Sequence, residues 1–223
     1  MKNSDIETII FDFGGVILDI DPQLTMNEFA RMGARKLDAD QTNELIYQIV
    51  RKFEKGIYTP EVFRETMKDF LQLKKIQDQE FDDAWNALLY DIPAKRIKAI
   101  EESKDHYQIF LLSNSNEIHY DLYVRDLQLR FGYREFDELF DKAYFSFDLH
   151  MAKPESEIFE FVIYQHDLNP AKTLFIDDMD VNLATAKKLG LCTYKMQKPE
   201  KVRHLFEEGK LKDEVKIVWP DGK

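Results

Sequence analysis

An aspartate, Asp12, lies at the end of an apolar segment and just before two glycines. The apolar segment, residues 6–10, is typical of a buried β-strand. Open α/β sheets bind ligands at the carboxyl ends of their strands, and Gly14 and Gly15 allow the backbone to approach a ligand closely. Asp12 is therefore placed to act as a nucleophile or a metal ligand. An aspartate that only caps a turn fits the same pattern.

Two more apolar strands end in polar residues farther along the chain. One ends at Ser113 and Asn114, and the other ends at the adjacent acids Asp177 and Asp178. Between them, Lys153 precedes a proline that can open a helix at its first turn. Because the carboxyl ends of parallel strands lie at one edge of a sheet, we expect these side chains to meet the first aspartate there.

These side chains have the composition that phosphoryl transfer requires, namely an in-line nucleophile, positive charge around the phosphoryl oxygens and a metal ion. A carboxylate such as Asp12 can attack phosphorus and form an aspartyl-phosphate intermediate. Because the carboxylate and the phosphate repel each other, a cation must lie between them. Mg²⁺ is bound by a few carboxylates together with water and phosphate oxygens. Asp12 and Asp178 suit this ligation, with Asp177 as a direct or indirect partner.

The remaining polar residues suit the phosphate group itself. Ser113 and Asn114, with the backbone amides around them, can donate hydrogen bonds to phosphate oxygens. Lys153 is a point charge on a long side chain and can neutralise the nucleophile and the phosphate together. Structural roles are the alternative: a helix cap for the serine, a surface position for the lysine, and loop caps for the two adjacent acids.

The order and spacing of these motifs resemble the haloacid dehalogenase superfamily, whose members are mostly magnesium-dependent phosphatases. The resemblance extends over nearly the whole chain. It rests on four motifs: Phe11-Asp12-Phe13-Gly14-Gly15-Val16-Ile17, Ser113-Asn114-Ser115-Asn116 with His119, Met151-Ala152-Lys153-Pro154, and Phe175-Ile176-Asp177-Asp178 with Asn182. Residues 11–21 look most similar to the bacterial glucose-1-phosphate phosphatase subgroup, which also lacks the usual second aspartate.

The resemblance implies roles in catalysis, phosphate binding and metal binding. The catalytic residues would be Asp12, as the nucleophile, and Lys153. The phosphate-binding residues would be Ser113, Asn114 and Lys153. The Mg²⁺ ligands would be Asp12, the backbone carbonyl of Gly14, Asp177 and Asp178. Asn182 would orient neighbouring side chains rather than react.

Gly14 is a departure from the usual pattern. Most phosphatases of the superfamily have an aspartate there, which acts as general acid on the leaving oxygen and then as base on water. Asp19 and Asp21 could replace it, although structural roles are favoured for both. His119 could face the site from the start of its helix, although a surface position is favoured. A leaving group that is easy to expel would ease the loss, which favours a sugar 1-phosphate as substrate.

The pattern of helices and strands predicts an α/β fold, a doubly wound parallel sheet with a helical cap inserted after the first strand. The cap is expected over residues 20–90, with Gly56 at a turn between two of its helices, and the core over residues 1–19 and 91–223. The core elements after the cap are expected to be helix 93–105, strand 107–112, a helix after Asn116, strand 142–146, helix 155–166, strand 172–176, helix 180–189, strand 191–196 and a final helix near 199–208.

The composition limits the partners and the compartment. With 31 basic and 42 acidic residues, for a net charge of −11, a broad nucleic-acid surface is not expected. No apolar run reaches the roughly 18 residues of a membrane-spanning helix, and the N-terminus is polar, unlike a signal peptide. Cys192 is the single cysteine, so no internal disulfide can form, and its apolar neighbours predict a buried strand. These features predict a cytoplasmic protein and leave its oligomeric state open.

The sequence thus predicts a magnesium-dependent phosphatase of small phosphorylated metabolites, with a sugar phosphate such as a hexose 1-phosphate favoured. Two alternatives belong to other classes. A dehalogenase of the 2-haloacid type would use the strand-end aspartate without a metal, although the adjacent acids Asp177 and Asp178 suit a cation site. A non-catalytic relative would only bind a phosphorylated ligand or a partner protein.

Overall fold

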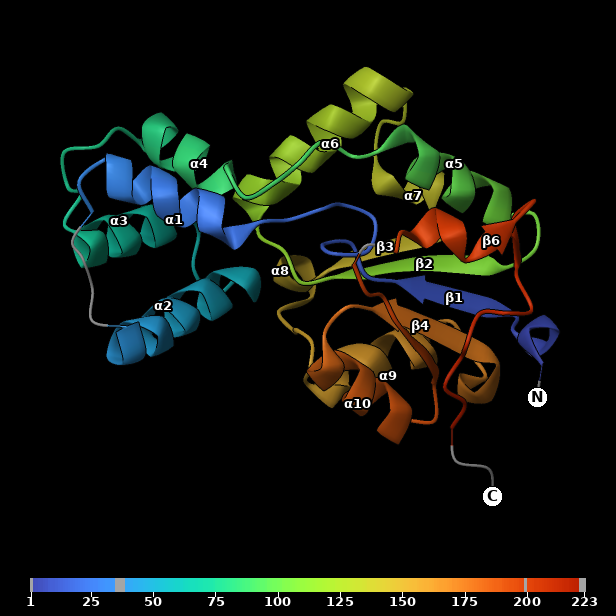
Figure 1. Ribbon diagram of the computed structural model, residues 1–223. Coiled ribbons are helices and arrows are strands. Elements are labelled where there is room, and N and C mark those ends of the chain that lie inside the picture. The colour runs from blue at the N-terminus through green and yellow to red at the C-terminus, as the bar shows by residue number, and fades with distance from the viewer. Residues whose placement is uncertain (1, 35–38, 199, 221–223) are drawn as a thin grey trace.

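The computed structural model describes residues 2–34, 39–198 and 200–220. Its centre is a five-stranded sheet with the order β3-β2-β1-β4-β5, in which all neighbouring strands are parallel (Figure 1). The strands are β1 (Thr8–Phe11), β2 (Gln108–Ser113), β3 (Lys142–Phe145), β4 (Thr173–Asp177) and β5 (Cys192–Lys195). The predicted α/β fold with a doubly wound parallel sheet is confirmed, and Cys192 is buried in a strand as expected.

Helices cover both faces of this sheet, which explains why its strands are continuous apolar runs in the sequence. On one face lie α9 (Ser156–Gln165) and α10 (Asp180–Lys188), and on the other lie α5 (Ala94–Ser103) and α7 (Phe136–Leu139) (Figure 1). Two further helices of the core are α6 (Glu117–Phe131) and α8 (Ser146–Leu149).

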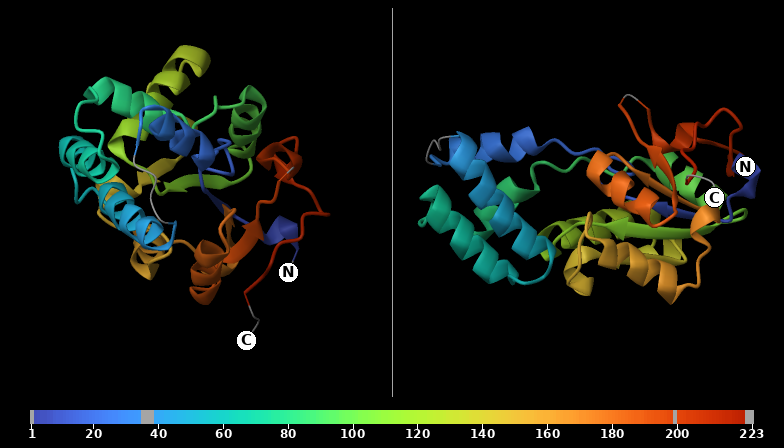
Figure 2. Two further views of the ribbon diagram at one scale, coloured as in Figure 1. Left: turned by 60° about the vertical axis from the view of Figure 1, so that its left-hand side comes forward. Right: turned by 90° about the horizontal axis from the view of Figure 1, so that it is seen from below.

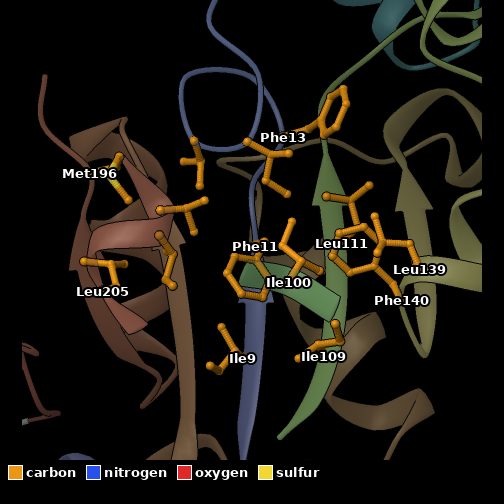
Figure 3. Packing of buried hydrophobic residues seen from close by; sticks show 14 of the residues in the cluster. Ile9, Phe11, Phe13, Ile100, Ile109, Leu111, Leu139, Phe140, Met196 and Leu205 are labelled. Atoms are coloured by element: carbon orange, nitrogen blue, oxygen red, sulfur yellow. The ribbon is translucent and has the colours of Figure 1, made fainter. Parts of the chain in front are cut away.

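Successive residues of β1 point to opposite faces of the sheet and enter different apolar clusters. Ile9 and Phe11 belong to a large cluster with Ile100 of α5 and Leu139 of α7 (Figure 3). Ile10 packs instead with residues of α9 and α10. Because β1 is buried on both sides, the carboxylate that follows it is attached to a rigid strand.

Four helices lie at one end of the sheet rather than on its faces (Figures 1 and 2). They are α1 (Pro22–Arg31), α2 (Ala39–Glu54), α3 (Pro60–Leu71) and α4 (Asp78–Asn86). Pro22 and Pro60 open α1 and α3, and the side chains of Asp21 and Thr59 cap these two helices. The helices share an apolar cluster that includes Phe29, Phe63, Phe81 and Trp85. They fall within residues 20–90, the range predicted for the cap.

The turn between α2 and α3 is pressed against the core. Gly56 lies in this turn with a φ of +61°, a conformation that glycine adopts without strain. A Cβ atom at this position would lie 2.3 Å from the carbonyl oxygen of Phe147 in α8. The turn that the sequence predicts at Gly56 is therefore also a contact between the four-helix part and the sheet part of the protein.

The structure corrects the sequence-based prediction at the C-terminal side. Instead of a helix over residues 199–208, of which residue 199 lies outside the described ranges, it has a single 3₁₀ turn (Val202–His204) and a short hairpin, β6 (Phe206–Glu207) and β7 (Lys210–Leu211). Near the C-terminus, Val218 bridges Thr193 of β5 in the antiparallel sense. Among the described residues, no helix combines the length and the apolar character needed to cross a bilayer.

Candidate active site

Lys153 links two carboxylates at the carboxyl edge of the sheet. Its Nζ atom donates to Asp12 Oδ1 at 2.7 Å and to Asp177 Oδ2 at 2.8 Å. The lysine side chain is 1% exposed, so the surface position that the sequence left open is excluded. Burial lowers the pKa of Lys153, but the charges of Asp12 and Asp177 outweigh burial and raise it overall. The side chain is therefore a permanent cation beside Asp12.

Lys153 reaches this position from a loop and not from a helix start. The peptide bond to Pro154 is cis, and α9 begins only at Ser156, so the proline does not open the helix as predicted. The carboxamide of Asn114 holds the loop in place. Asn114 Nδ2 donates to the carbonyl of Lys153 at 2.9 Å, and Asn114 Oδ1 accepts from the backbone amide of Lys153 at 2.9 Å.

The side chain of Asn114 is thus bonded to the backbone of Lys153. Phosphate binding by Asn114 stays a prediction, and the backbone amide of Asn114 would be the group that donates. Ser113 ends β2 and is buried, with a contact of 3.4 Å from its Oγ to the carbonyl of Asn114. The residue that caps the following helix α6 is Asn116, whose side chain accepts from the amide of His119. The helix-cap role considered for Ser113 therefore belongs to Asn116.

Asp177 is fully buried, and its carboxylate is occupied on both oxygens. Besides Lys153, it accepts from the backbone amide of Met179 at 2.7 Å and from Asn182 Nδ2 at 3.1 and 3.0 Å. Asn182 therefore orients an acid of the site, in line with the expectation from the sequence. Asp177 in turn holds Lys153 against Asp12.

Asp178 is half-buried and completes a cluster of three acids. Oxygen atoms of Asp12, Asp177 and Asp178 lie within 4.8 Å of one another. Burial, aided by the charge of Asp177 and opposed by the charge of Lys153, raises the pKa of Asp12 to about 7. Burial and Asp177 also raise the pKa of Asp178. Carboxylates that are this costly to ionise together are stabilised by a cation, and a set of carboxylate oxygens is the donor type that Mg²⁺ prefers.

The two glycines after Asp12 have different surroundings. Gly15 has a φ of +79°, and a Cβ atom there would lie 2.4 Å from Asp178 Oδ2. At Gly14 the nearest atom to a Cβ would be Ile20 Cδ1, at 3.4 Å, which is an ordinary contact. The backbone at Gly15 therefore requires glycine for the approach of Asp178, whereas the space at Gly14 would admit a side chain.

His119 was expected at the surface, and this expectation is wrong. Its ring is buried and stacks on Trp85 of α4, with centroids 5.1 Å apart and planes at 12°. Asn116 Nδ2 donates to Nδ1 at 3.0 Å, and Nε2 lies 3.4 Å from the carbonyl of Trp85. Burial lowers the pKa of His119 to about 4, so the ring is neutral near pH 7. The histidine joins α6 to the four-helix part.

Asp19 and Asp21 have structural partners, as expected. Asp19 accepts from Arg96 Nη2 at 2.6 Å and from Lys201 Nζ at 2.8 Å. Asp21 accepts from the amide of Gln23 at 3.0 Å and caps α1. Neither carboxylate is available to replace the one that Gly14 lacks.

The sequence does not predict a role for the charged residues at the end of α2. Arg51 Nη2 donates to the carbonyl of Ala152 at 3.0 Å and lies 3.3 Å from Glu155 Oε1. Lys55 Nζ lies 2.8 Å from the other oxygen of Glu155. These contacts fix the end of α2 to the loop that carries Lys153. No motif marks them, because they join segments about a hundred residues apart in the chain.

A parallel sheet with a strand-end acid, a buried lysine and an acid pair at one edge defines a class of hydrolases. The model of the haloacid dehalogenase-like hydrolase family matches residues 6–190, and the chain belongs to this family. Among individual proteins, it is 30% identical over 191 residues to a D-ribitol-5-phosphate phosphatase of Bacteroides thetaiotaomicron, covering 85% of this chain and 91% of the relative.

Solved structures agree with this assignment. The family enzyme bt-2542 of Bacteroides thetaiotaomicron is 33% identical, with a TM-score of 0.82 over 91% of this chain and 98% of that one. A complex of that enzyme with magnesium and inorganic phosphate has a TM-score of 0.79 at 33% identity, over 91% of this chain and all of that one. The L-2-haloacid dehalogenase of Xanthobacter autotrophicus is 18% identical, with a TM-score of 0.53 over 85% of this chain and 77% of that one. That likeness shows the fold alone.

Proposed function

We propose that this chain is a Mg²⁺-dependent phosphatase of small phosphorylated sugars or sugar alcohols, acting through an aspartyl-phosphate on Asp12. The observation that carries the proposal is the arrangement of one buried cation, Lys153, between Asp12 and Asp177, with Asp178 beside them. A carboxylate held in this way lies against positive charge that can also bind a phosphoryl oxygen. The relatives named above, a phosphatase and an enzyme complexed with magnesium and phosphate, support the same reading.

In this proposal Asp12, Asp178 and the carbonyl of Gly14 hold the metal, which would neutralise phosphoryl oxygens when bound. Asp177 keeps Lys153 in position through its own contacts with Asn182 and Met179. Ser113 and the amide of Asn114 stand at the end of β2, where they can donate to the phosphoryl group.

Two substrate types fit the proposal. The lack of a carboxylate at Gly14 favours a substrate with a good leaving group, such as a hexose 1-phosphate. The curated relative, in contrast, is a phosphatase of D-ribitol 5-phosphate, whose leaving group is a primary alkoxide. The subgroup of glucose-1-phosphate phosphatases is not confirmed by the relatives found, so a pentitol or hexitol phosphate is the second candidate. The four helices α1 to α4 would select between them, as a cap over the site.

The test is a screen of phosphorylated sugars and sugar alcohols for phosphate release, with Mg²⁺ and after exhaustive chelation. We expect release that stops on chelation and returns with added Mg²⁺. Asp12→Asn should abolish turnover while the variant remains folded, because an amide is not a nucleophile toward phosphorus. Phosphate release at the wild-type rate by freshly purified Asp12→Asn would contradict the assignment. Halide release from 2-chloropropionate in metal-free buffer would favour the dehalogenase alternative.

A further inference from the structure

The site lacks a proton donor where Gly14 replaces the usual carboxylate, and the groups closest in sequence do not supply one. Asp19 and Asp21 are held by their structural partners. His119 is enclosed between Trp85 and Asn116 and is neutral near pH 7. A donor for the leaving oxygen must therefore come from another element.

Glu54 is the last residue of α2, the helix whose C-terminal end points toward α8 and the carboxyl edge of the sheet (Figure 1). One turn earlier, Arg51 donates to the carbonyl of Ala152, the residue before Lys153. This contact anchors the end of α2 beside the lysine of the site. The side chain of Glu54 is only 26% exposed, although it carries a carboxyl group.

The carboxyl group of Glu54 has few partners in the protein. Within the described ranges it accepts no hydrogen bond, and its ion pair with Arg51 Nη1 is long, at 3.8 Å. Arg51 itself is engaged more closely by Ala152 and Glu155. Because the Glu54 side chain keeps 26% of its surface exposed and has no close partner among the described residues, its carboxyl group is available to bond to a ligand group.

The electrostatics of the neighbourhood connect Glu54 with the reacting groups. Burial raises the pKa of Glu54, and the charges of Arg51 and Lys153 oppose that shift in part, so Glu54 lies within the field of the catalytic lysine. The phenol of Tyr123 has its pKa raised mainly by burial and further by two carboxylates, Asp12 and Glu54. Asp12 and Glu54 therefore both act electrostatically on the same buried phenol.

We propose that Glu54 is the general acid and base of this enzyme, supplied by the helical part in place of the carboxylate missing at Gly14. The inference rests on the proposed phosphatase function. In the first step Asp12 bonds to phosphorus, the bond from phosphorus to the leaving oxygen breaks, and that oxygen takes the proton of Glu54. In the second step Glu54 accepts a proton from the water whose oxygen bonds to phosphorus, the bond to Asp12 breaks, and phosphate leaves.

This assignment changes the substrate class that the site can serve. With a proton available from Glu54, the enzyme does not need a leaving group that departs unaided. An alkyl phosphate with a primary alkoxide, such as a sugar alcohol 5-phosphate, becomes a suitable substrate. Proton donation would also depend on the end of α2 being seated on the loop that carries Lys153.

The experiment compares Glu54→Gln with wild-type protein on two kinds of substrate. One is the alkyl phosphate that the wild type hydrolyses fastest, and the other is p-nitrophenyl phosphate, whose leaving group needs no proton. We expect kcat/KM for the alkyl phosphate to fall by about 10²- to 10⁴-fold. With p-nitrophenyl phosphate we expect a burst of one nitrophenol per enzyme, followed by slow turnover, because water attack still needs the base.

Glu44→Gln is the matched control, since Glu44 is an exposed acid on the same helix, and it should behave as wild type. Binding of Mg²⁺ with beryllium fluoride should be equal in all three proteins. Equal losses in the first turnover of both substrates, an increase in KM alone, or undiminished alkyl phosphate hydrolysis would each overturn the role of Glu54. A wild-type protein that hydrolyses no phosphate ester would overturn the proposed function and this inference with it.

Discussion

The carboxamide of Asn114 is bonded to both backbone polar groups of Lys153, at 2.9 Å in each case. The two residues are 39 positions apart in the chain and belong to different motifs of the family pattern. The lysine that contacts Asp12 is therefore positioned by an asparagine that follows β2. This relationship makes Asn114 testable apart from any contact with phosphate.

We expect Asn114→Ala to lower kcat by about a hundredfold, because a misplacement by about 1 Å of Lys153, the lysine proposed to be catalytic, can cost that much. The loss of two hydrogen bonds should lower the free energy of unfolding by about 1–3 kcal/mol. Steady-state kinetics and urea unfolding measure the two effects. As a control, Asn169→Ala removes a similar side chain-to-backbone bond far from the site and should leave kcat unchanged. Unaltered kcat in Asn114→Ala would show that the lysine holds its place without this contact.

The two glycines provide a matched pair of substitutions. Gly15→Ala should weaken Mg²⁺ binding and activity strongly, because the new Cβ atom would collide with Asp178 and the residue would keep a strained positive φ. Gly14→Ala should have a much smaller effect, since the carbonyl remains and the methyl group meets only Ile20. Titration calorimetry with Mg²⁺ distinguishes them. Equal affinities in the two variants would show that Asp178 does not need the space at Gly15.

The buried His119 predicts how stability depends on pH. The pKa of His119 is about 4 in the folded protein and 6.5 for a histidine without contacts, as in the unfolded chain. Between these two pH values the unfolded chain therefore binds a proton that the folded protein does not. The contribution of His119 to the free energy of unfolding should therefore be fully present above pH 6.5. It should fall by up to about 3 kcal/mol as the pH decreases to 4.

Urea unfolding at several pH values checks this dependence. In His119→Phe the part of the slope that comes from the histidine should vanish, whatever the absolute stability of the variant. His106 is exposed, and His106→Gln should keep the wild-type slope. A slope that persists in His119→Phe would assign the pH dependence to other groups.

The contact between Glu155 and the end of α2 predicts how firmly the helical part is seated. Glu155→Gln removes the ion pairs with Lys55 and Arg51, each partly exposed and worth roughly 0–1 kcal/mol. Trypsin should then cut after Lys55 faster than in the wild type, and a bound phosphate analogue should slow the cut. Glu157→Gln, which changes an exposed acid in the first turn of α9, is the control. An unchanged cleavage rate would mean that other contacts hold the turn.

The strands that carry the site could be predicted because strands buried on both faces are continuous apolar runs, and their ends mark the edge where ligands bind. The position of Asp12, Lys153 and the acid pair at that edge followed from motif order. The predicted helix 199–208 failed because apolar residues such as Val202 and Phe206 have a helical spacing. The chain instead turns at Gly209, whose φ is +78°, and forms a hairpin.

Other features depend on contacts between distant segments, which leave no local pattern. The burial of His119 requires Trp85, which belongs to another helix. The position of Glu54 depends on the hydrogen bond from Arg51 to the carbonyl of Ala152, which holds the end of α2 against the core. Neither partner is recognisable before the two parts of the protein are assembled.

The close approach of Gly56 to the carbonyl of Phe147 limits how such enzymes can be recombined. The four helices and the sheet part meet there without room for a side chain. About a turn away, Arg51 holds the same interface through its hydrogen bond to the carbonyl of Ala152. A chimera that imports the helical part of a relative must therefore import a glycine at this turn as well. The substrate specificity of such chimeras would be transferred only when all four helices are exchanged together. Exchanging single helices would break their contact with the sheet part of the protein.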